Sequence, residues 1–517
     1  MSGGGPAPGE RVRAALRDAS SSARGAPRGP FAPGPWRAPR AAAPRAPSGA
    51  LGLLASIAIA STVFNDMPPL LPAGELSNDP FILLFPLLCA ALLPGLRAFG
   101  LSRALLLLAG AFLGAALLSV WANHDGIAAA SFQGRAGYGR VFSQGLVVGF
   151  GLAVALVAHH LAARGHLGDI GRGARWGLAI MLAVGALELA SWFGTPLLTQ
   201  IHDAISVVVH WDDDGLYPRR LRSTAFEVSW AAVILTFVFP FAFASAKGRT
   251  RAAFALGTVA LVALSGSRTA MLVFAVQFAI LGLAMLRGRL DRALRIGALA
   301  ALAALALLQV PSVGREIGTV ASNLVEYGTA AGPNETVGPD GNVSNVTRLA
   351  HIRMGLEMFA ENPVLGVGFG QYGFHYPDHV RAEDLRSWEV RAHLGLSGYE
   401  IGWPPIYSNH VRVMAEMGGV GLAAWVLLLS VPLVMSACRA RDDTEEGRHH
   451  VAVVMTLVGW IALGASIDTF RFFGGFVAIG VALALARRPA AVSPTAGPAR
   501  GWTPEVRPAP ATARRTP

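Results

Sequence analysis

Long apolar stretches alternate with short polar ones along this chain, and this pattern predicts a helical membrane protein. Apolar runs suited to crossing a bilayer lie at 49–64, 80–95, 102–121, 142–163, 175–195, 226–246, 251–265, 268–287, 294–310, 411–437, 449–466 and 471–486. In lipid, a helix satisfies its own backbone hydrogen bonds. The runs therefore predict an all-α polytopic membrane protein with about twelve transmembrane helices.

One long polar segment, at about 311–410, separates the ninth and tenth runs. Because apolar runs bracket it, the whole segment is expected on one side of the membrane. Within it, residues 345–359 carry apolar side chains at helical spacing, and Thr347 is placed to cap that helix. The segment is therefore predicted to be a partly helical loop, and function is expected at its face of the membrane.

Composition and charge support a membrane protein. The 517 residues are 53% hydrophobic and 15% charged, with a mean hydropathy of +0.47, whereas soluble domains average about 25% charged residues. The net charge of +11 comes from arginines in the tails and short loops, so it indicates membrane orientation and no nucleic-acid partner. Cys89 and Cys438 provide neither a disulfide framework nor a cysteine-rich metal site.

The loop charges predict the orientation. Residues 1–48 and 487–517, rich in proline, alanine and arginine, are predicted to be disordered cytoplasmic tails. The basic loops fall on the same side, at 97–103, 164–175, 247–251, 287–295 and 439–450. The expected order is therefore helices 1–9 in 49–310, an outer-face loop in 311–410, and helices 10–12 in 411–486.

Basic side chains nevertheless gather at the predicted outer face. They are Arg135, Arg140, Arg219, Arg220, Arg222, Arg268, Arg348, His351, Arg353 and His410. An anionic ligand would account for them, although an arginine can also reach lipid headgroups or pair with a loop carboxylate. Arg268 has the strongest signal: with Ser267 before it at a helix start, its guanidinium and the helix N-terminus favour a phosphate.

His410 follows Asn409 at the mouth of a predicted helix. An imidazole there suits a general base acting on a sugar hydroxyl near neutral pH, although it could equally hydrogen-bond the loop backbone. Trp211-Asp-Asp-Asp214 is a possible divalent-metal site, but such a run is more often solvated. Gly366-Val-Gly-Phe-Gly370 lacks the strand–turn–helix setting of a nucleotide loop. Neither a metal nor a cofactor is expected.

Four motifs occur in a set order between about 210 and 425. They are Arg220–Ser229, Ser265–Ala270, Arg348 with Asn362–Gly370, and Asn409-His410 with Ala415–Gly421. In this order and setting the chain resembles the O-antigen ligase and O-antigen polymerase family. The resemblance implies a GT-C-like fold and an integral-membrane, metal-independent, inverting glycosyltransferase. It also implies an active site on the outer, periplasmic face of the inner (cytoplasmic) membrane.

The resemblance implies a donor glycan on undecaprenyl pyrophosphate, a glycan or glycolipid acceptor, and a bilayer around the protein. Arg220, Arg222 and Arg268 would hold the pyrophosphate, and His410 would be the base. Arg348 would position substrate, with His351, Arg353, Ser267 and Asn409 as further binding residues. A repeat-unit polymerase of the same family, a twelve-span secondary transporter and a non-enzymatic scaffold are the alternatives. The sequence does not identify the acceptor.

Overall fold

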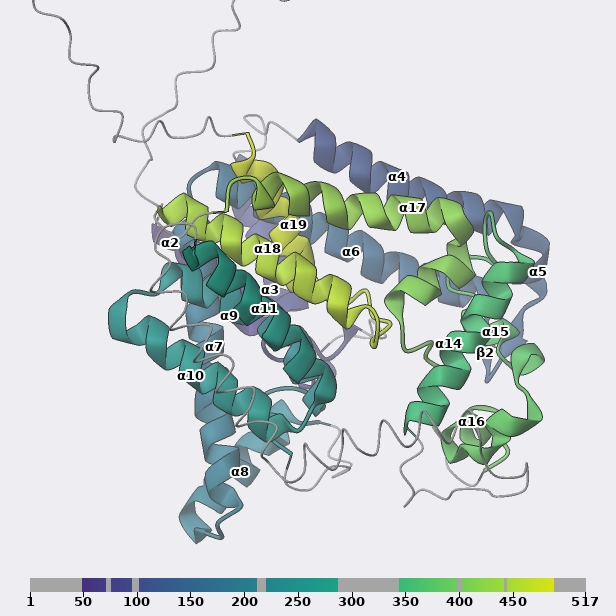
Figure 1. Ribbon diagram of the computed structural model, residues 1–517, viewed down its shortest axis with the longest axis horizontal. Coiled ribbons are helices and arrows are strands. Elements are labelled where there is room, and N and C mark those ends of the chain that lie inside the picture. The colour runs from purple at the N-terminus through teal and green to yellow at the C-terminus, as the bar shows by residue number, and fades with distance from the viewer. Residues whose placement is uncertain are drawn as a thin grey trace, which may run out of the picture. The chain divides into compact units, whose positions relative to one another are not determined.

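The computed structural model describes residues 49–70, 76–94, 102–211, 220–286, 344–397, 402–440 and 444–487, which are mainly helical (Figure 1). The helices are α2 (Gly49–Ser61), α3 (Phe81–Leu92), α4 (Arg103–Ala122), α5 (His124–Ala129), α6 (Gly137–Ala163), α7 (Leu167–Ser191), α8 (Pro196–Val209), α9 (Val228–Ser245), α10 (Gly248–Ser265), α11 (Arg268–Leu286), α14 (Ser344–Glu361), α15 (Tyr372–His375), η3 (Pro377–His379), η4 (Ala382–Arg386), α16 (Trp388–His393), α17 (Asn409–Ala437), α18 (Glu445–Leu463) and α19 (Phe473–Leu485). β1 (Ser131–Phe132) and β2 (Arg135–Ala136) form a small antiparallel hairpin.

The helices agree with an all-α membrane protein. Of the described helices, six are long and apolar enough to cross a membrane, namely α4, α6, α7, α9, α11 and α17. The shorter apolar helices are α2, α3, α8 and α19. The predicted run 294–310 and the tails 1–48 and 488–517 lie outside the described residues, so the number twelve stays a prediction.

Helix α7 begins at Leu167, eight residues before the apolar run predicted there. The extra turns carry charge, but Asp169 is buried and its two oxygens contact His166 at 2.9 Å and Arg172 at 3.1 Å. Because the carboxylate is paired, the polar turns can continue the helix. Apolar periodicity alone could not place this start.

Helix α9 lies in the interior of the bundle, packed against α7, α11, α18 and α19. Helices α6 and α19 approach each other closely because glycines line their contact. A Cβ on Gly480 would lie 2.2 Å from the Ala155 carbonyl oxygen, and one on Gly151 would lie 2.3 Å from the Phe476 ring. Small residues at a helix contact are typical of membrane proteins, where close packing rather than the hydrophobic effect holds helices together.

Helix α17 is broken at Gly418, whose φ of 63° requires a residue without a Cβ. The break lets the segment after α14 add hydrogen bonds to the helix. Val367 N–H donates to the Ala415 carbonyl at 2.9 Å, and Gly419 N–H donates to the Pro363 carbonyl at 2.8 Å. The glycine-rich segment 366–370 is therefore a docking element between α14 and α17.

The segment from α14 to α16 forms its own small core, called here the loop domain (residues 344–397). Its buried apolar side chains are Ala350, Met354, Met358, Val367, Tyr372, Tyr376 and Val390, and they also contact Ile406 and Ala415. The predicted loop helix is present as α14, but Thr347 does not cap it. The helix begins at Ser344, and the Thr347 hydroxyl contacts the Ser387 hydroxyl at 2.6 Å.

Candidate functional site

The turn before α9 is held by a carboxylate from a membrane helix. Glu188 of α7 accepts hydrogen bonds from the backbone N–H of Arg222 at 3.2 Å and of Ser223 at 2.7 Å. Ser223 has a φ of 57°, and its hydroxyl donates to the Met181 carbonyl at 2.6 Å. A buried carboxylate needs such donors. Glu188 therefore fixes the backbone from which Arg220 and Arg222 project.

The start of α11 lies beside that turn. The Ser267 hydroxyl accepts the N–H of Ala270 at 3.3 Å, so Ser267 caps the helix directly before Arg268. Gly266 has a φ of 61°, and a Cβ there would lie 3.5 Å from Nε of Arg220. The structure therefore brings Arg220, Ser267 and Arg268 together at the N-terminus of α11, where backbone N–H groups favour an anion.

Ser466, in the loop after α18, joins α11 to the loop domain. Its hydroxyl contacts the Thr269 hydroxyl at 3.2 Å, and its carbonyl accepts from Nη1 of Arg348 at 3.1 Å. Ser466 thereby links Arg348 on α14 to Thr269, the residue that follows Arg268. Arg222 has a different contact, because its Nη1 donates to the Phe226 carbonyl at 3.3 Å.

Arg348 also covers Tyr407, with its guanidinium carbon 4.9 Å from the ring centre. The Tyr407 hydroxyl donates to Glu389 at 3.4 Å, and Tyr407 holds a φ of 56°. Left-handed backbone at a residue other than glycine is costly and is concentrated at functional sites. Glu389 also hydrogen-bonds Thr347.

Opposing effects act on the pKa of the Glu389 carboxyl. Burial raises its pKa above the ordinary value, and the hydrogen bond from Thr347 and the charge of Arg348 lower it. Glu227, the residue before α9, adds a second negative charge that also acts on Tyr407. The site therefore combines several arginines with two carboxylates, which suits binding of an anionic group beside a proton acceptor.

His410 lies at the start of α17, against α18. Its Nε2 donates to the Ile461 carbonyl at 2.8 Å, and its Nδ1 accepts the indole N–H of Trp425 at 3.2 Å. The two contacts require a neutral ring with the proton on Nε2. The remaining lone pair is directed at Trp425, so this geometry does not favour proton transfer to a substrate.

The other predicted binding residues have structural partners. Asn409 is buried, and its amide donates to the Thr469 carbonyl at 3.1 Å. His351 is buried in the loop domain between the Pro405 carbonyl and the Tyr376 hydroxyl. Arg353 forms ion pairs with Glu357 and Asp384. These contacts hold the loop domain together, and they do not place His351 or Arg353 beside Arg268.

Sequence reasoning missed Glu188, Glu389, Tyr407 and Ser466. Glu188 had one available signal, because a lone carboxylate inside an apolar run is costly unless it has a role. Tyr407 precedes the Ser-Asn-His stretch, but its backbone angle is visible only in the structure. Nothing in the spacing of Glu389 or Ser466 relates them to Arg348.

Metal binding is not indicated within the described ranges, where no three His, Cys, Asp or Glu side chains are grouped for an ion. The alternative site at Asp212–Asp214 lies outside those ranges. Metal independence therefore stays a prediction.

Comparison with known proteins gives one family. Residues 252–426 match the family model described as O-antigen ligase, which confirms the resemblance seen in the motifs. The matched stretch runs from α10 into α17 and includes Arg268, Arg348, Glu389 and Tyr407. No curated protein matches the chain. The match supports a ligase-type or polymerase-type function in polysaccharide biosynthesis, carried out in a membrane.

Proposed function

We propose, from the O-antigen ligase domain at residues 252–426, that this protein transfers a glycan from undecaprenyl pyrophosphate to an acceptor sugar hydroxyl at the outer face of the inner membrane. One observation carries the proposal. Ser466 joins Thr269, beside Arg268, to Arg348, and the guanidinium of Arg348 covers Tyr407, which donates to Glu389. Such a group matches a pyrophosphate leaving group with a nearby proton acceptor.

On the donor side, the pyrophosphate would lie at the N-terminus of α11. Arg268, Arg220 and Arg222 would bind its oxygens, and the helix N–H groups would add to their effect. These groups would stabilise the negative charge that develops as the bond from the anomeric carbon to the phosphate oxygen breaks. Arg348 would position the glycan next to this bond.

On the acceptor side, we propose that Glu389 is the base that accepts the proton of the acceptor hydroxyl. Its oxygens can accept a substrate hydroxyl in addition to Tyr407, and its raised pKa makes it a better proton acceptor than an ordinary carboxylate. The hydroxyl oxygen would attack the anomeric carbon, the electron pair would leave with pyrophosphate, and the proton would pass to Glu389. This single displacement inverts the anomeric centre. His410 is the rival base, and mutation separates the two.

A purified-protein assay tests the proposal. The protein, the lipid-linked donor and candidate acceptors are combined in excess chelator, and the glycan product and released undecaprenyl pyrophosphate are measured. We expect transfer without added metal. Transfer that appears only with Mg²⁺ or Mn²⁺ would move the chemistry to Asp212–Asp214, and no transfer with any acceptor would favour a transporter or scaffold.

A deletion strain separates ligase from polymerase. Loss of long chains from the acceptor while free polymer persists indicates a ligase, and accumulation of single repeat units indicates a polymerase. The proposed orientation has its own test. Reporter fusions after Lys247 and at the C-terminus should report cytoplasm, and a fusion near Leu396 in the loop domain should report the outer side.

A further inference from the structure

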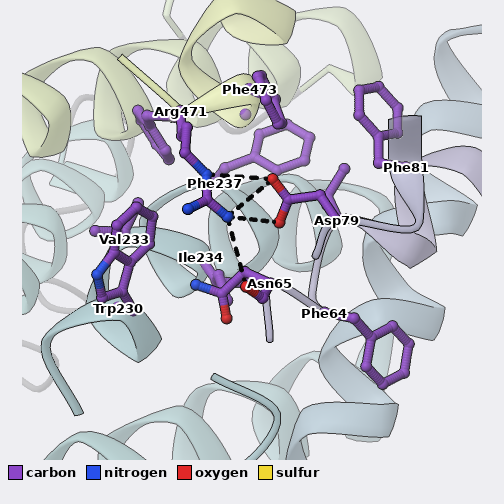
Figure 2. Close-up of a pocket in the computed structure, with 13 residues that line it drawn as sticks. Phe64, Asn65, Asp79, Phe81, Trp230, Val233, Ile234, Phe237, Arg471 and Phe473 are labelled. Atoms are coloured by element: carbon purple, nitrogen blue, oxygen red, sulfur yellow. Dashed lines mark hydrogen bonds and ion pairs between the residues drawn. The ribbon is translucent and has the colours of Figure 1, made fainter. Parts of the chain in front are cut away.

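A narrow, partly open hollow lies next to the proposed reaction site and has no part in the mechanism above. Its walls come from the segment after α2, the start of α3, the first half of α9, and the start of α19 with the residues before it (Figure 2). Most of the lining side chains are apolar or aromatic, and Trp230 and Phe237 are among them. The polar lining residues are Thr62, Asn65, Asp79 and Arg471. This composition is typical of small-molecule sites.

The two charged side chains in the hollow, Arg471 and Asp79, form an ion pair. Arg471 donates to Asp79 through Nη2 at 3.0 Å and through Nε at 3.3 Å. Both side chains are largely removed from solvent. The pair therefore offers no net charge to a ligand. A pyrophosphate would meet the Asp79 carboxylate as well as the guanidinium, so an uncharged ligand suits the hollow better.

Two N–H donors remain available in it. Nη1 of Arg471 and the amide nitrogen of Asn65 have no hydrogen-bond partner within the described part of the chain, whereas the Asn65 oxygen accepts the N–H of Phe226 at 3.0 Å. Figure 2 shows both nitrogens directed toward the side where Trp230 lies. Two donors beside an aromatic wall favour a ligand rich in hydroxyl and ether oxygens.

The hollow shares two elements with the proposed site. Trp230 lies one turn after Glu227 on α9, and Arg471 lies three residues after Asp468. Asp468 accepts the N–H of Ile406 at 2.9 Å and acts electrostatically on Tyr407. A glycan whose reacting end lies at Tyr407 and Glu389 can therefore extend toward Trp230.

We propose that this hollow is a glycan subsite that binds an uncharged pyranose unit of the substrate, with Asn65 and Arg471 donating to its oxygens beside Trp230. The subsite rests on the proposed glycan transfer for its substrate. In the subsite, the protein would bind a sugar unit of the substrate that lies away from the bond being broken. The same chemistry fits the donor glycan and the acceptor glycan, and the experiment separates these sources.

Two substitutions each remove one of these donors. Asn65→Asp keeps the oxygen that accepts from Phe226, replaces the amide donor with a second oxygen and adds a negative charge. Arg471→Lys keeps a cation beside Asp79 and loses Nη1, together with the paired contact to Asp79 and the stacking of the guanidinium on Trp230. Thr62→Val is the matched control: Thr62 lines the hollow, but its hydroxyl already donates to the Ile59 carbonyl at 2.7 Å. Its replacement leaves both donors in place.

Binding is measured on the full protein in lipid nanodiscs with two probes: the oligosaccharide released from the organism's lipid-linked donor, and undecaprenyl pyrophosphate without sugar. We expect Asn65→Asp and Arg471→Lys each to weaken oligosaccharide binding about 3–10-fold, the usual effect of one hydrogen bond, and to leave the sugar-free lipid unaffected. Thr62→Val should bind as the native protein does. This measurement needs no turnover, so it stands apart from the transfer assay.

Turnover identifies the source of the sugar. A rise in KM for the donor alone assigns the subsite to the donor glycan, and a rise for the acceptor alone assigns it to the acceptor. Unchanged oligosaccharide binding in both variants would overturn the subsite. So would weaker binding of the sugar-free lipid, since it would assign the hollow to the lipid carrier. Equal weakening by Thr62→Val would also overturn it, because the shape of the hollow would then explain the effect.

Discussion

The indole N–H of Trp425 donates to Nδ1 of His410 at 3.2 Å, and the Nε2 of the same ring donates to the Ile461 carbonyl. Both ring nitrogens are thus used within the bundle. The imidazole joins the start of α17 to α18, while Arg348 and Thr269 both contact Ser466. With both nitrogens of His410 in use, we expect Glu389 and not His410 to be the base.

Glu389→Gln should lower the rate of transfer by about 10²–10⁴-fold, since the amide keeps the shape of the side chain but accepts no proton. His410→Gln should reduce the rate much less, because an amide can still hydrogen-bond Trp425 and Ile461. Single-turnover rates of the purified variants check this. A large loss in His410→Gln with an active Glu389→Gln would return the base to His410.

The pH dependence should identify the same group. Glu389 must be ionised to accept a proton, and burial raises its pKa, so activity should fall as the pH falls through that raised value. In Glu389→Gln this acidic limb should disappear. An unchanged pH profile in the variant would exclude Glu389 as the base.

Arg268→Lys should impair transfer severely although it preserves the charge, because lysine cannot bind phosphate oxygens with a planar pair of donors. Arg348→Lys should behave similarly, since it alters both the Ser466 bond and the contact with Tyr407. Arg135→Lys is the control, an exposed arginine beside Trp403. Near-normal kcat/KM in Arg268→Lys would show that Arg268 contacts the lipid headgroups and does not bind the pyrophosphate.

Gly418→Ala should detach the loop domain from α17. Its φ of 63° and ψ of −159° lie in a region essentially restricted to glycine and cost an alanine about 1–3 kcal/mol, and the added Cβ would lie 2.3 Å from the Val364 carbonyl carbon. Gly395→Ala is the matched control, with a φ of 71° and no atom within 4 Å of the added Cβ. Thermal unfolding should show a much larger loss for Gly418→Ala. Equal losses would mean that the close contact with Val364 has no role.

The loop domain should lose stability in mild acid. Burial lowers the pKa of His351 to about 3 and that of His393 to about 4, whereas a free imidazole titrates near about 6.5. Between these values the unfolded state binds more protons, so stability is complete above the unfolded pKa and declines as the pH falls below it. Hydrogen exchange of α14, corrected for the chemical rate, should show the loss between pH 7 and 5. Helix α4, which contains no histidine, provides the internal comparison.

The sequence by itself determined the membrane class, because apolar runs of spanning length leave few other folds. It also located Arg268 and Arg348, since cations at helix edges and a serine-capped helix start are local patterns. The break of α17 was not predicted, although the glycines were visible. Its cause is the close approach of the segment after α14, which lies far away along the chain.

Only the tertiary structure decided the partners of each polar side chain. His351 and His410 have the same chemistry, and both are held by carbonyl and ring contacts from distant segments. Glu389 and Ser466 join the arginines through contacts across the fold. Spacing along a chain reports which face of a helix a side chain occupies, whereas proton transfer depends on which lone pairs remain open after packing. That second property arises only when separate segments meet.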